Sequence, residues 1–149
     1  MAKIRVTKEF IFEAAHALWN YNGNCRHIHG HSYRLQVTVI GDPLDNSARS
    51  GAGMVIDFSE LKKIVKDSII DKFDHALILS RMAKIHYDTA AKQMFDKLIL
   101  TDYQPTCENL VADFATVIRA LLPAEVKLFS MRLYETANSW ADWFADDNL

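Results

Sequence analysis

Ser32-Tyr33-Arg34-Leu35-Gln36-Val37-Thr38-Val39 alternates polar and apolar side chains without interruption. Successive residues of a β-strand point to opposite faces of a sheet, so this pattern predicts a strand with one buried and one exposed face. Residues 4–14 show the same alternation, and His16 has the parity of their apolar members. A loop of turn-forming residues at 19–24 separates the two strands, which makes them a candidate hairpin. The apolar members of the first strand are Ile4, Val6, Phe10, Phe12 and Ala14.

Helical spacing replaces this alternation in the middle of the chain. Asp57-Phe58-Ser59-Glu60 resembles a capping box and predicts a helix that ends near Asp71-Lys72. Residues 82–99 carry a second helical pattern, and Thr106 predicts the N-cap of a third helix, which Pro123 ends. The apolar positions of the three patterns are Phe58, Leu61, Ile64, Val65 and Ile69; Met82, Ile85, Met94, Phe95, Leu98 and Ile99; and Leu110, Val111, Phe114, Val117, Ile118 and Leu121.

Two further strands, at residues 126–135 and 139–144, complete the order β, β, α, (α), α, β, β. Strands in adjacent pairs favour antiparallel hairpins. We therefore expect an α+β fold in which helices cover one face of an antiparallel four-stranded sheet. Such a sheet leaves two open edges, and oligomerisation is a common way to cover them.

The composition restricts the class of protein. The 149 residues predict a single domain, 1–149, and a hydrophobic content of 50% argues against intrinsic disorder. The formal net charge of −2 supports neither a nucleic-acid nor a membrane partner, and no apolar run reaches the ~20 residues that span a bilayer. With two cysteines and no signal-peptide pattern, the expected location is the reducing cytoplasm.

Three of the histidines form a candidate metal site. His29 and His31 lie two residues apart at the start of the second strand, so their side chains point to the same side. Hairpin pairing would bring His16, at the end of the first strand, beside them. Three neutral imidazoles suit zinc, and three protein ligands leave a fourth position open, as in catalytic zinc sites.

Cys25 precedes this pair of histidines by four residues and allows more than one interpretation. A thiol close to Zn²⁺ has a lowered pKa and can act as a base or nucleophile. Three alternatives exist. Cys25 shares the parity of His27, His29 and His31 and could close a structural site as a fourth ligand, or it could be a buried structural cysteine. It could also form a disulfide with Cys107, which a reducing compartment disfavours. The turn-forming residues around Cys25 favour a loop, which argues against the closed site.

Acid–base groups occur at two further places. Asp74-His75 follows the first helix, where the carboxylate can orient the imidazole, although a plain surface position is the alternative. Glu135 shares the strand parity of Phe129, Met131 and Leu133, so it lies at the end of an apolar row of side chains. A charge that faces apolar side chains is costly unless it is paired. A ligand with two adjacent N–H donors would satisfy both carboxylate oxygens, and a rim glutamate at a strand end is the alternative.

Six short motifs occur in a fixed order along nearly the whole chain. As an ordered set they resemble the 6-pyruvoyl-tetrahydropterin synthase / 6-carboxy-tetrahydropterin synthase family. The chain departs from the family's pattern between Leu77 and Gln104, a longer stretch than in compact bacterial members, and in the tail after Thr136. The motifs are Phe12-Glu13-Ala14-Ala15-His16, Cys25-x-x-x-His29-Gly30-His31-Ser32-Tyr33, Val55-Ile56-Asp57-Phe58-Ser59-Glu60-Leu61-Lys62, Phe73-Asp74-His75, Pro105-Thr106-Cys107-Glu108-Asn109 and Tyr134-Glu135-Thr136.

This resemblance implies a tunnelling fold, in which subunits join edge to edge into a barrel, usually a hexamer built from two trimers. It implies that substrate sites lie between subunits. It also implies a zinc ion at His16, His29 and His31, with Cys25 as the base that removes a proton from the substrate.

The same resemblance implies roles for the remaining polar residues. His75, oriented by Asp74, would relay protons. Glu135 would anchor the aminopyrimidine edge of a pterin and assist the relay. Thr106 and Glu108 match positions that help to bind the pterin.

The short gap between Cys25 and His29 resembles that of the bacterial queuosine-pathway branch, the 6-carboxy-5,6,7,8-tetrahydropterin synthases. This branch implies conversion of 7,8-dihydroneopterin triphosphate to 6-carboxy-tetrahydropterin, acetaldehyde and triphosphate. The alternatives are a 6-pyruvoyl-tetrahydropterin product, formed without side-chain cleavage, and a non-catalytic zinc- or pterin-binding module. Candidates to hold the triphosphate, by proximity to the zinc ligands, are Lys8, Arg26 and His27.

Overall fold

The structure, a computed structural model, describes residues 2–45, 50–84 and 93–149. Its strands are β1 (Ile4–His16), β2 (His29–Gly41), β3 (Ala76–Ser80), β4 (Leu98–Thr101), β5 (Lys127–Thr136) and β6 (Ser139–Phe144). Its helices are α1 (Phe58–Val65), which continues through a π-helical turn (Lys66–Ile70) into the short α2 (Asp71–Phe73), and α4 (Cys107–Leu121). Short 3-10 turns lie at Asn24–Arg26, Arg81–Ala83 and Ala145–Asn148.

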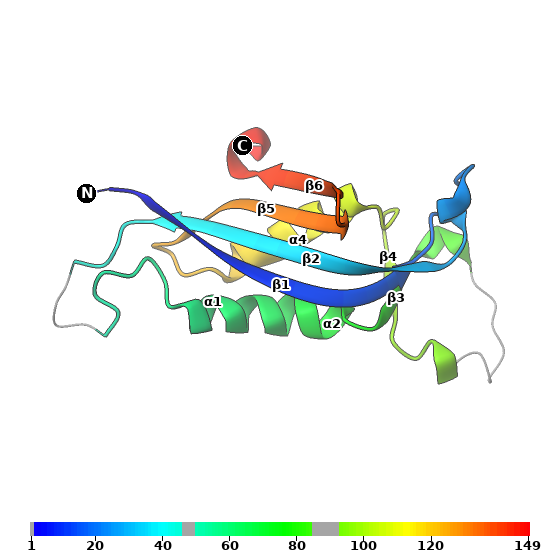
Figure 1. Ribbon diagram of the computed structural model, residues 1–149, viewed down its shortest axis with the longest axis horizontal. Coiled ribbons are helices and arrows are strands. Elements are labelled where there is room, and N and C mark those ends of the chain that lie inside the picture. The colour runs from blue at the N-terminus through cyan, green and yellow to red at the C-terminus, as the bar shows by residue number, and fades with distance from the viewer. Residues whose placement is uncertain (1, 46–49, 85–92) are drawn as a thin grey trace.

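The long hairpin of β1 and β2 forms the centre of the sheet (Figure 1). Its antiparallel register pairs Ile4 with Gly41 at one end and His16 with His29 at the other. β5 pairs with β2 and β6 pairs with β5, both antiparallel, so the four strands expected from the sequence are neighbours. The register of the hairpin alone places the end of β1 beside the start of β2.

The expected sheet of four antiparallel strands is, however, incomplete. The described residues form a mixed six-stranded sheet in the order β4-β3-β1-β2-β5-β6, in which β3 runs parallel to β1 and β4 parallel to β3. All five residues of β3 are buried. A strand that is buried on both faces lacks the alternation that reveals a half-buried strand, which explains why the sequence does not reveal β3.

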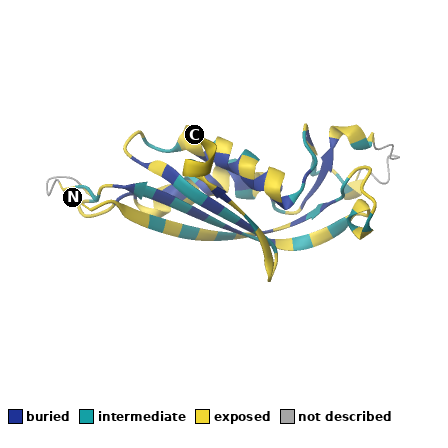
Figure 2. Ribbon diagram, turned by 90° about the horizontal axis from the view of Figure 1, so that it is seen from above, coloured by how far each residue is buried: buried dark blue, intermediate teal, exposed yellow. Residues whose placement is uncertain are grey.

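Helices α1, α2 and α4 cover one face of the curled sheet, and buried residues gather between these layers (Figure 2). Along β2, the alternate residues Tyr33, Leu35, Val37 and Val39 are fully buried on that face. The Asp57 carboxylate accepts a hydrogen bond from the Ser59 amide at 2.7 Å and caps α1, as the motif predicts. Within the described segments, no helix is long and apolar enough to cross a membrane.

A bulge in β5 changes which residues face the core. The pairing of β2 with β5 passes from Thr38–Ser130 to Val39–Leu128, so Phe129 is the extra residue. Leu128 is buried in place of Phe129, which is only half-buried. The expected row is therefore wrong at Phe129, whereas its C-terminal part, which ends at Glu135, keeps its alternation.

The helical patterns also fail at particular positions. Leu98 and Ile99, expected in a helix over residues 82–99, lie in β4, and Ile85 of the same pattern lies outside the described residues. Phe58 and Leu121, expected to face the core, are 52% and 51% exposed. Phe58 is the first residue of α1 and Leu121 the last of α4, beyond the turns that pack on the sheet.

Candidate metal centre

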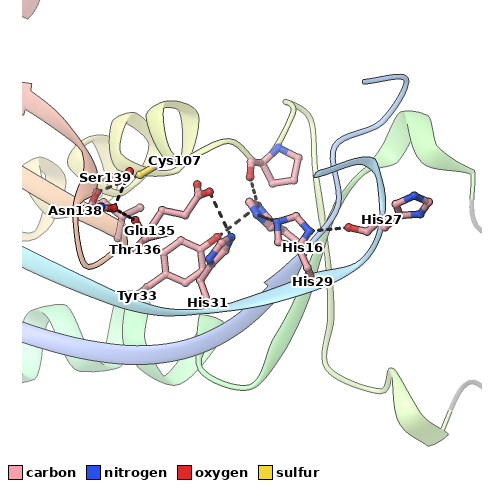
Figure 3. A network of polar contacts seen from close by, with 12 residues as sticks. His16, His27, His29, His31, Tyr33, Cys107, Glu135, Thr136, Asn138 and Ser139 are labelled. Atoms are coloured by element: carbon pink, nitrogen blue, oxygen red, sulfur yellow. Dashed lines mark hydrogen bonds and ion pairs between the residues drawn. The ribbon is translucent and has the colours of Figure 1, made fainter. Parts of the chain in front are cut away.

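Three histidines converge where β1 ends and β2 begins (Figure 3). His16 is buried, His29 and His31 are half-buried, and one nitrogen of each lies within 4.8 Å of the other two. The ring centroids form a nearly equilateral triangle with sides of 4.6, 4.9 and 5.1 Å. The antiparallel register explains the cluster, because it places His16 directly opposite His29, and His31 follows on the same face of β2.

Backbone carbonyls fix the protonation of two of these rings. The Nδ1 atom of His16 lies 2.7 Å from the carbonyl oxygen of Pro105, and Nδ1 of His29 lies 2.6 Å from that of His27. A carbonyl oxygen only accepts hydrogen bonds, so each Nδ1 must carry the proton. In the neutral rings the lone pairs are therefore on the Nε2 atoms, which lie 3.1 Å apart. Two facing lone pairs repel each other unless they share a cation.

His31 adds a third nitrogen that lacks a hydrogen bond. Its Nε2 atom is buried and, within the described structure, makes no hydrogen bond, although the Glu135 Oε1 atom lies 3.3 Å away. Burial lowers the pKa of His31, and the negative charge of Glu135 opposes this shift only in part. Burial likewise lowers the pKa of His16. Neutral imidazoles with free Nε2 atoms are the form that binds zinc, so the residues present fit a metal ion.

Tyr33 and Pro105 support this cluster, and reasoning from the sequence assigned a role to neither. The fully buried Tyr33 hydroxyl lies 3.4 Å from Nδ1 of His16, and its ring stacks on Phe12 with centroids 5.0 Å apart. Tyr33 shares the parity of His31, which is a signal that could have placed it beside the cluster. The Pro105 carbonyl has no such signal, because it meets His16 across 89 residues of sequence.

Cys25 lies in the 3-10 turn between His16 and His29 and is half-buried. Its carbonyl accepts a hydrogen bond from the Leu18 amide at 2.8 Å, which closes the loop after His16. Among the described residues, Cys25 does not join the group formed by the three histidines. Cys25 and Cys107 are both free thiols, and the buried Cys107 donates to the Leu133 carbonyl at 3.1 Å. This geometry agrees with neither the four-ligand site nor the disulfide.

Asp74 and His75 form a dyad at the outer side of the sheet. Nδ1 of His75 lies 2.9 Å from an Asp74 oxygen, and the other oxygen accepts the Glu13 amide at 2.8 Å. That backbone bond, more than the contact with His75, holds the pKa of Asp74 below its usual value. His75 is largely exposed and borders a hollow of about 350 Å³ beside Gly30 and His31. Within the described residues, no contact joins His75 to the other imidazoles.

Thr106 and Glu108 lie at the start of α4. The Thr106 hydroxyl accepts a hydrogen bond from the Asn109 amide at 3.3 Å and so caps the helix, as predicted. Glu108 is exposed in the first turn, where the helix dipole favours a negative charge. Both positions are explained by helix stability, and their expected contact with a pterin stays a prediction.

A family model described as "6-pyruvoyl tetrahydropterin synthase" matches residues 5–146. The chain belongs to this family. Two curated relatives are named 6-carboxy-5,6,7,8-tetrahydropterin synthase. The relative from Haemophilus influenzae is 33% identical over 141 residues, which cover 93% of this chain and 97% of the relative. The relative from Synechocystis is 35% identical over 145 residues, which cover 94% and 92%.

Two solved structures share this fold. The 6-pyruvoyl tetrahydropterin synthase of Caenorhabditis elegans superimposes with a TM-score of 0.69 at 21% identity and covers 97% of each chain. An uncharacterized protein from Wolinella succinogenes gives a TM-score of 0.76 at 20% identity and covers 97% of this chain and 99% of that one. At such identities the likeness concerns the fold alone.

Proposed function

We propose that this protein is a zinc-dependent 6-carboxy-5,6,7,8-tetrahydropterin synthase, a single catalytic domain acting as a homo-oligomer in the cytoplasm. Its substrate would be 7,8-dihydroneopterin triphosphate, and its products 6-carboxy-tetrahydropterin, acetaldehyde and triphosphate. The observation that carries the proposal is the convergence of three imidazole nitrogens next to the Glu135 carboxylate. The names of the relatives support the choice of reaction.

His16, His29 and His31 would hold the zinc ion. When bound, zinc supplies Lewis-acid polarisation of the hydroxyl groups on the pterin side chain. Glu135 would bind the ring, since its two carboxylate oxygens match two adjacent N–H donors of an aminopyrimidine edge. The carboxylate is 24% exposed and lies against His31, so a ring held there would bring its side chain to the imidazoles.

The Cys25 thiolate would remove a proton from the side chain, and the resulting negative charge would delocalise into the dihydropterin ring. Triphosphate would then leave, and one water molecule would add to the side-chain carbon next to the ring, so that cleavage of the adjoining carbon–carbon bond gives the 6-carboxylate and acetaldehyde. Asp74 would orient His75 as the proton relay, and Thr106 and Glu108 would contact the pterin. His75 borders the same hollow as His31, and we expect it to serve a site between subunits.

The test is incubation of metal-analysed protein with 7,8-dihydroneopterin triphosphate, with the products identified by mass. The proposal expects one equivalent of acetaldehyde for each triphosphate released, and loss of both products after removal of the metal. An unchanged substrate in the presence of stoichiometric zinc would refute the proposal. That result would favour a binding module without catalysis.

A second candidate is the 6-pyruvoyl-tetrahydropterin synthase reaction, which the description of the matching family favours. It releases triphosphate from the same substrate but leaves the carbon side chain intact. The two reactions therefore differ in the pterin that they form and in the release of acetaldehyde. Triphosphate release without acetaldehyde would identify the second reaction.

A further inference from the structure

The loop that carries Cys25 connects β1 to β2 at one end of the hairpin (Figure 1). It comprises residues 17–28, and its regular element is the 3-10 turn Asn24–Arg26. The Leu18 amide donates a hydrogen bond to the Cys25 carbonyl at 2.8 Å and so joins the two arms of the loop. The position of Cys25 therefore depends on the contacts that hold the first arm, residues 17–20.

The Gln104 side chain holds this first arm through two hydrogen bonds to a single residue. Its Oε1 atom accepts a hydrogen bond from the Trp19 amide at 2.8 Å, and its Nε2 atom donates to the Trp19 carbonyl at 2.7 Å. Two antiparallel strands exchange bonds in the same pattern, and here a carboxamide takes the place of the second backbone. Because both bonds go to one residue, they fix its orientation as well as its position.

Gln104 is itself tied to helix α4 and to the metal centre. Its carbonyl accepts a hydrogen bond from the amide of Thr106, the N-cap of α4, at 2.7 Å. The next residue, Pro105, accepts a hydrogen bond from Nδ1 of His16 at 2.7 Å. One short segment, residues 104–106, therefore holds both a candidate metal ligand and the loop that follows it.

The residue that follows Trp19 needs such support. Asn20 has a left-handed backbone with φ of 56°, which few residues other than glycine adopt. Asparagine tolerates this conformation better than most residues, but at a cost in free energy that surrounding contacts must offset. The two bonds from Gln104 fix the peptide groups on both sides of Trp19, the second of which leads into Asn20. Without them, we expect the first arm to relax and to carry Leu18 away from the Cys25 carbonyl.

We propose that Gln104 is a positioning residue for the reaction, which acts by fixing the loop of Cys25. Its bonds to Trp19 hold the first arm, and the bond between Leu18 and Cys25 passes this constraint to the thiol-bearing residue. The inference rests on the proposed function, because it is there that Cys25 acts as the base. Gln104 holds the loop and not the substrate, so its loss should slow proton removal and leave binding of the pterin at Glu135 intact.

The test compares Gln104→Met with Gln36→Met. Methionine keeps the length of the side chain and removes its hydrogen bonds. Gln36 serves as the matched control, because its carboxamide donates to Glu9 on the face of β2 away from the core. The first measurement is amide hydrogen exchange, followed by NMR, at Leu18, whose amide reports the bond to Cys25.

Two hydrogen bonds correspond to roughly 5- to 150-fold in an equilibrium. The Leu18 amide should therefore exchange roughly 5- to 150-fold faster in Gln104→Met and at the parent rate in Gln36→Met. Gln104→Glu keeps the acceptor for the Trp19 amide and loses the donor, so its effect should be smaller. The amides of Leu35 and Val37, in the core of β2, should exchange as in the parent protein, which separates a loosened loop from a weakened fold.

The second measurement is steady-state kinetics of the zinc-loaded protein with 7,8-dihydroneopterin triphosphate. In Gln104→Met, kcat should fall by the same factor as the protection of Leu18, whereas KM and zinc content should stay within twofold of the parent values. Gln36→Met should keep both kinetic constants.

Three outcomes would overturn this assignment: unchanged exchange at Leu18 in Gln104→Met, faster exchange with an unchanged kcat, and a raised KM with an unchanged kcat. The last would indicate that Gln104 serves substrate binding. If the parent protein itself does not convert the pterin, the proposed function fails, and exchange at Leu18 still decides whether Gln104 fixes the loop of Cys25.

Discussion

Replacement of Glu135 by glutamine separates binding of the pterin from binding of the metal. The substitution keeps the size of the side chain and removes its charge. Glu135 is the next-to-last residue of β5 and is half-buried, so the change leaves the buried core residues in place. The amide also replaces one acceptor oxygen by a donor, which cannot pair with an N–H group of a pterin ring.

The expected loss follows from the contacts of the carboxylate. Hydrogen bonds to a charged group contribute about 1.5–3 kcal/mol, so Glu135→Gln should weaken binding of a phosphate-free pterin by roughly 10- to 150-fold. The metal should be unaffected. The charge of Glu135 raises the pKa of His31, so its removal leaves the imidazole neutral at pH 7 and available as a ligand.

Two measurements test this prediction: fluorescence titration with 7,8-dihydroneopterin, and zinc stoichiometry after dialysis. Glu125→Gln, an exposed glutamate just before β5, serves as the matched control. We expect normal zinc content with weakened pterin binding in Glu135→Gln alone. Loss of zinc with unchanged pterin affinity would show that Glu135 acts as a metal ligand, and it would refute the anchoring role.

Three further predictions concern the base, the core and the pH response. Cys25→Ala should abolish turnover and keep zinc at the parent stoichiometry, whereas loss of zinc would restore the four-ligand interpretation. Phe12→Ala should lower the free energy of unfolding by about 3–5 kcal/mol in urea titration, because Phe12 is buried and stacks on Tyr33; a loss below 1 kcal/mol would contradict this packing. The pKa values of His16 and His31 are lower in the folded than in the unfolded chain, so the unfolded chain binds more protons below pH 6.5. The melting temperature of metal-free protein should therefore fall as the pH drops below about 6.5, and a rise would contradict the burial of these rings.

The part of the fold that follows from the sequence is the part with one buried and one exposed face. The alternation along β1 and β2 specifies the hairpin, because a shift of one residue would expose every core side chain. The alternation of side chains does not predict β3 and β4, because β3 is buried on both faces and β4 has only four residues. The sequence does not predict the bulge at Phe129 either, because the extra residue is defined only by the pairing of β5 with β2.

The site, like the fold, can be predicted from the sequence only in part. The parity of His16, His29 and His31 predicts their convergence, because it depends only on strand geometry and hairpin register. The protonation of the His16 and His29 rings depends on the carbonyls of Pro105 and His27. Because every residue has a backbone carbonyl, the sequence does not show which one will accept a hydrogen bond from a histidine. The candidate ligands can therefore be identified from the residue types, whereas the contacts that would prepare them to bind a cation come from the tertiary structure.

The Asp74-His75 dyad shows what the segment between Leu77 and Gln104 contributes. His75 has a left-handed backbone with φ of 60°, a conformation that costs a non-glycine residue about 1–2 kcal/mol. Two contacts hold it there: the His75 amide donates to the Glu13 carbonyl, and the Lys97 ammonium donates to the carbonyls of Asp71 and Asp74.

Lys97 immediately precedes β4, and its own carbonyl accepts the amide of Leu77 in β3. β4 and the Lys97 ammonium therefore together stabilise a strained turn. Strain that the surrounding structure maintains is a mark of functional positions. His75 is largely exposed, as we expect of a proton relay that serves a site between subunits.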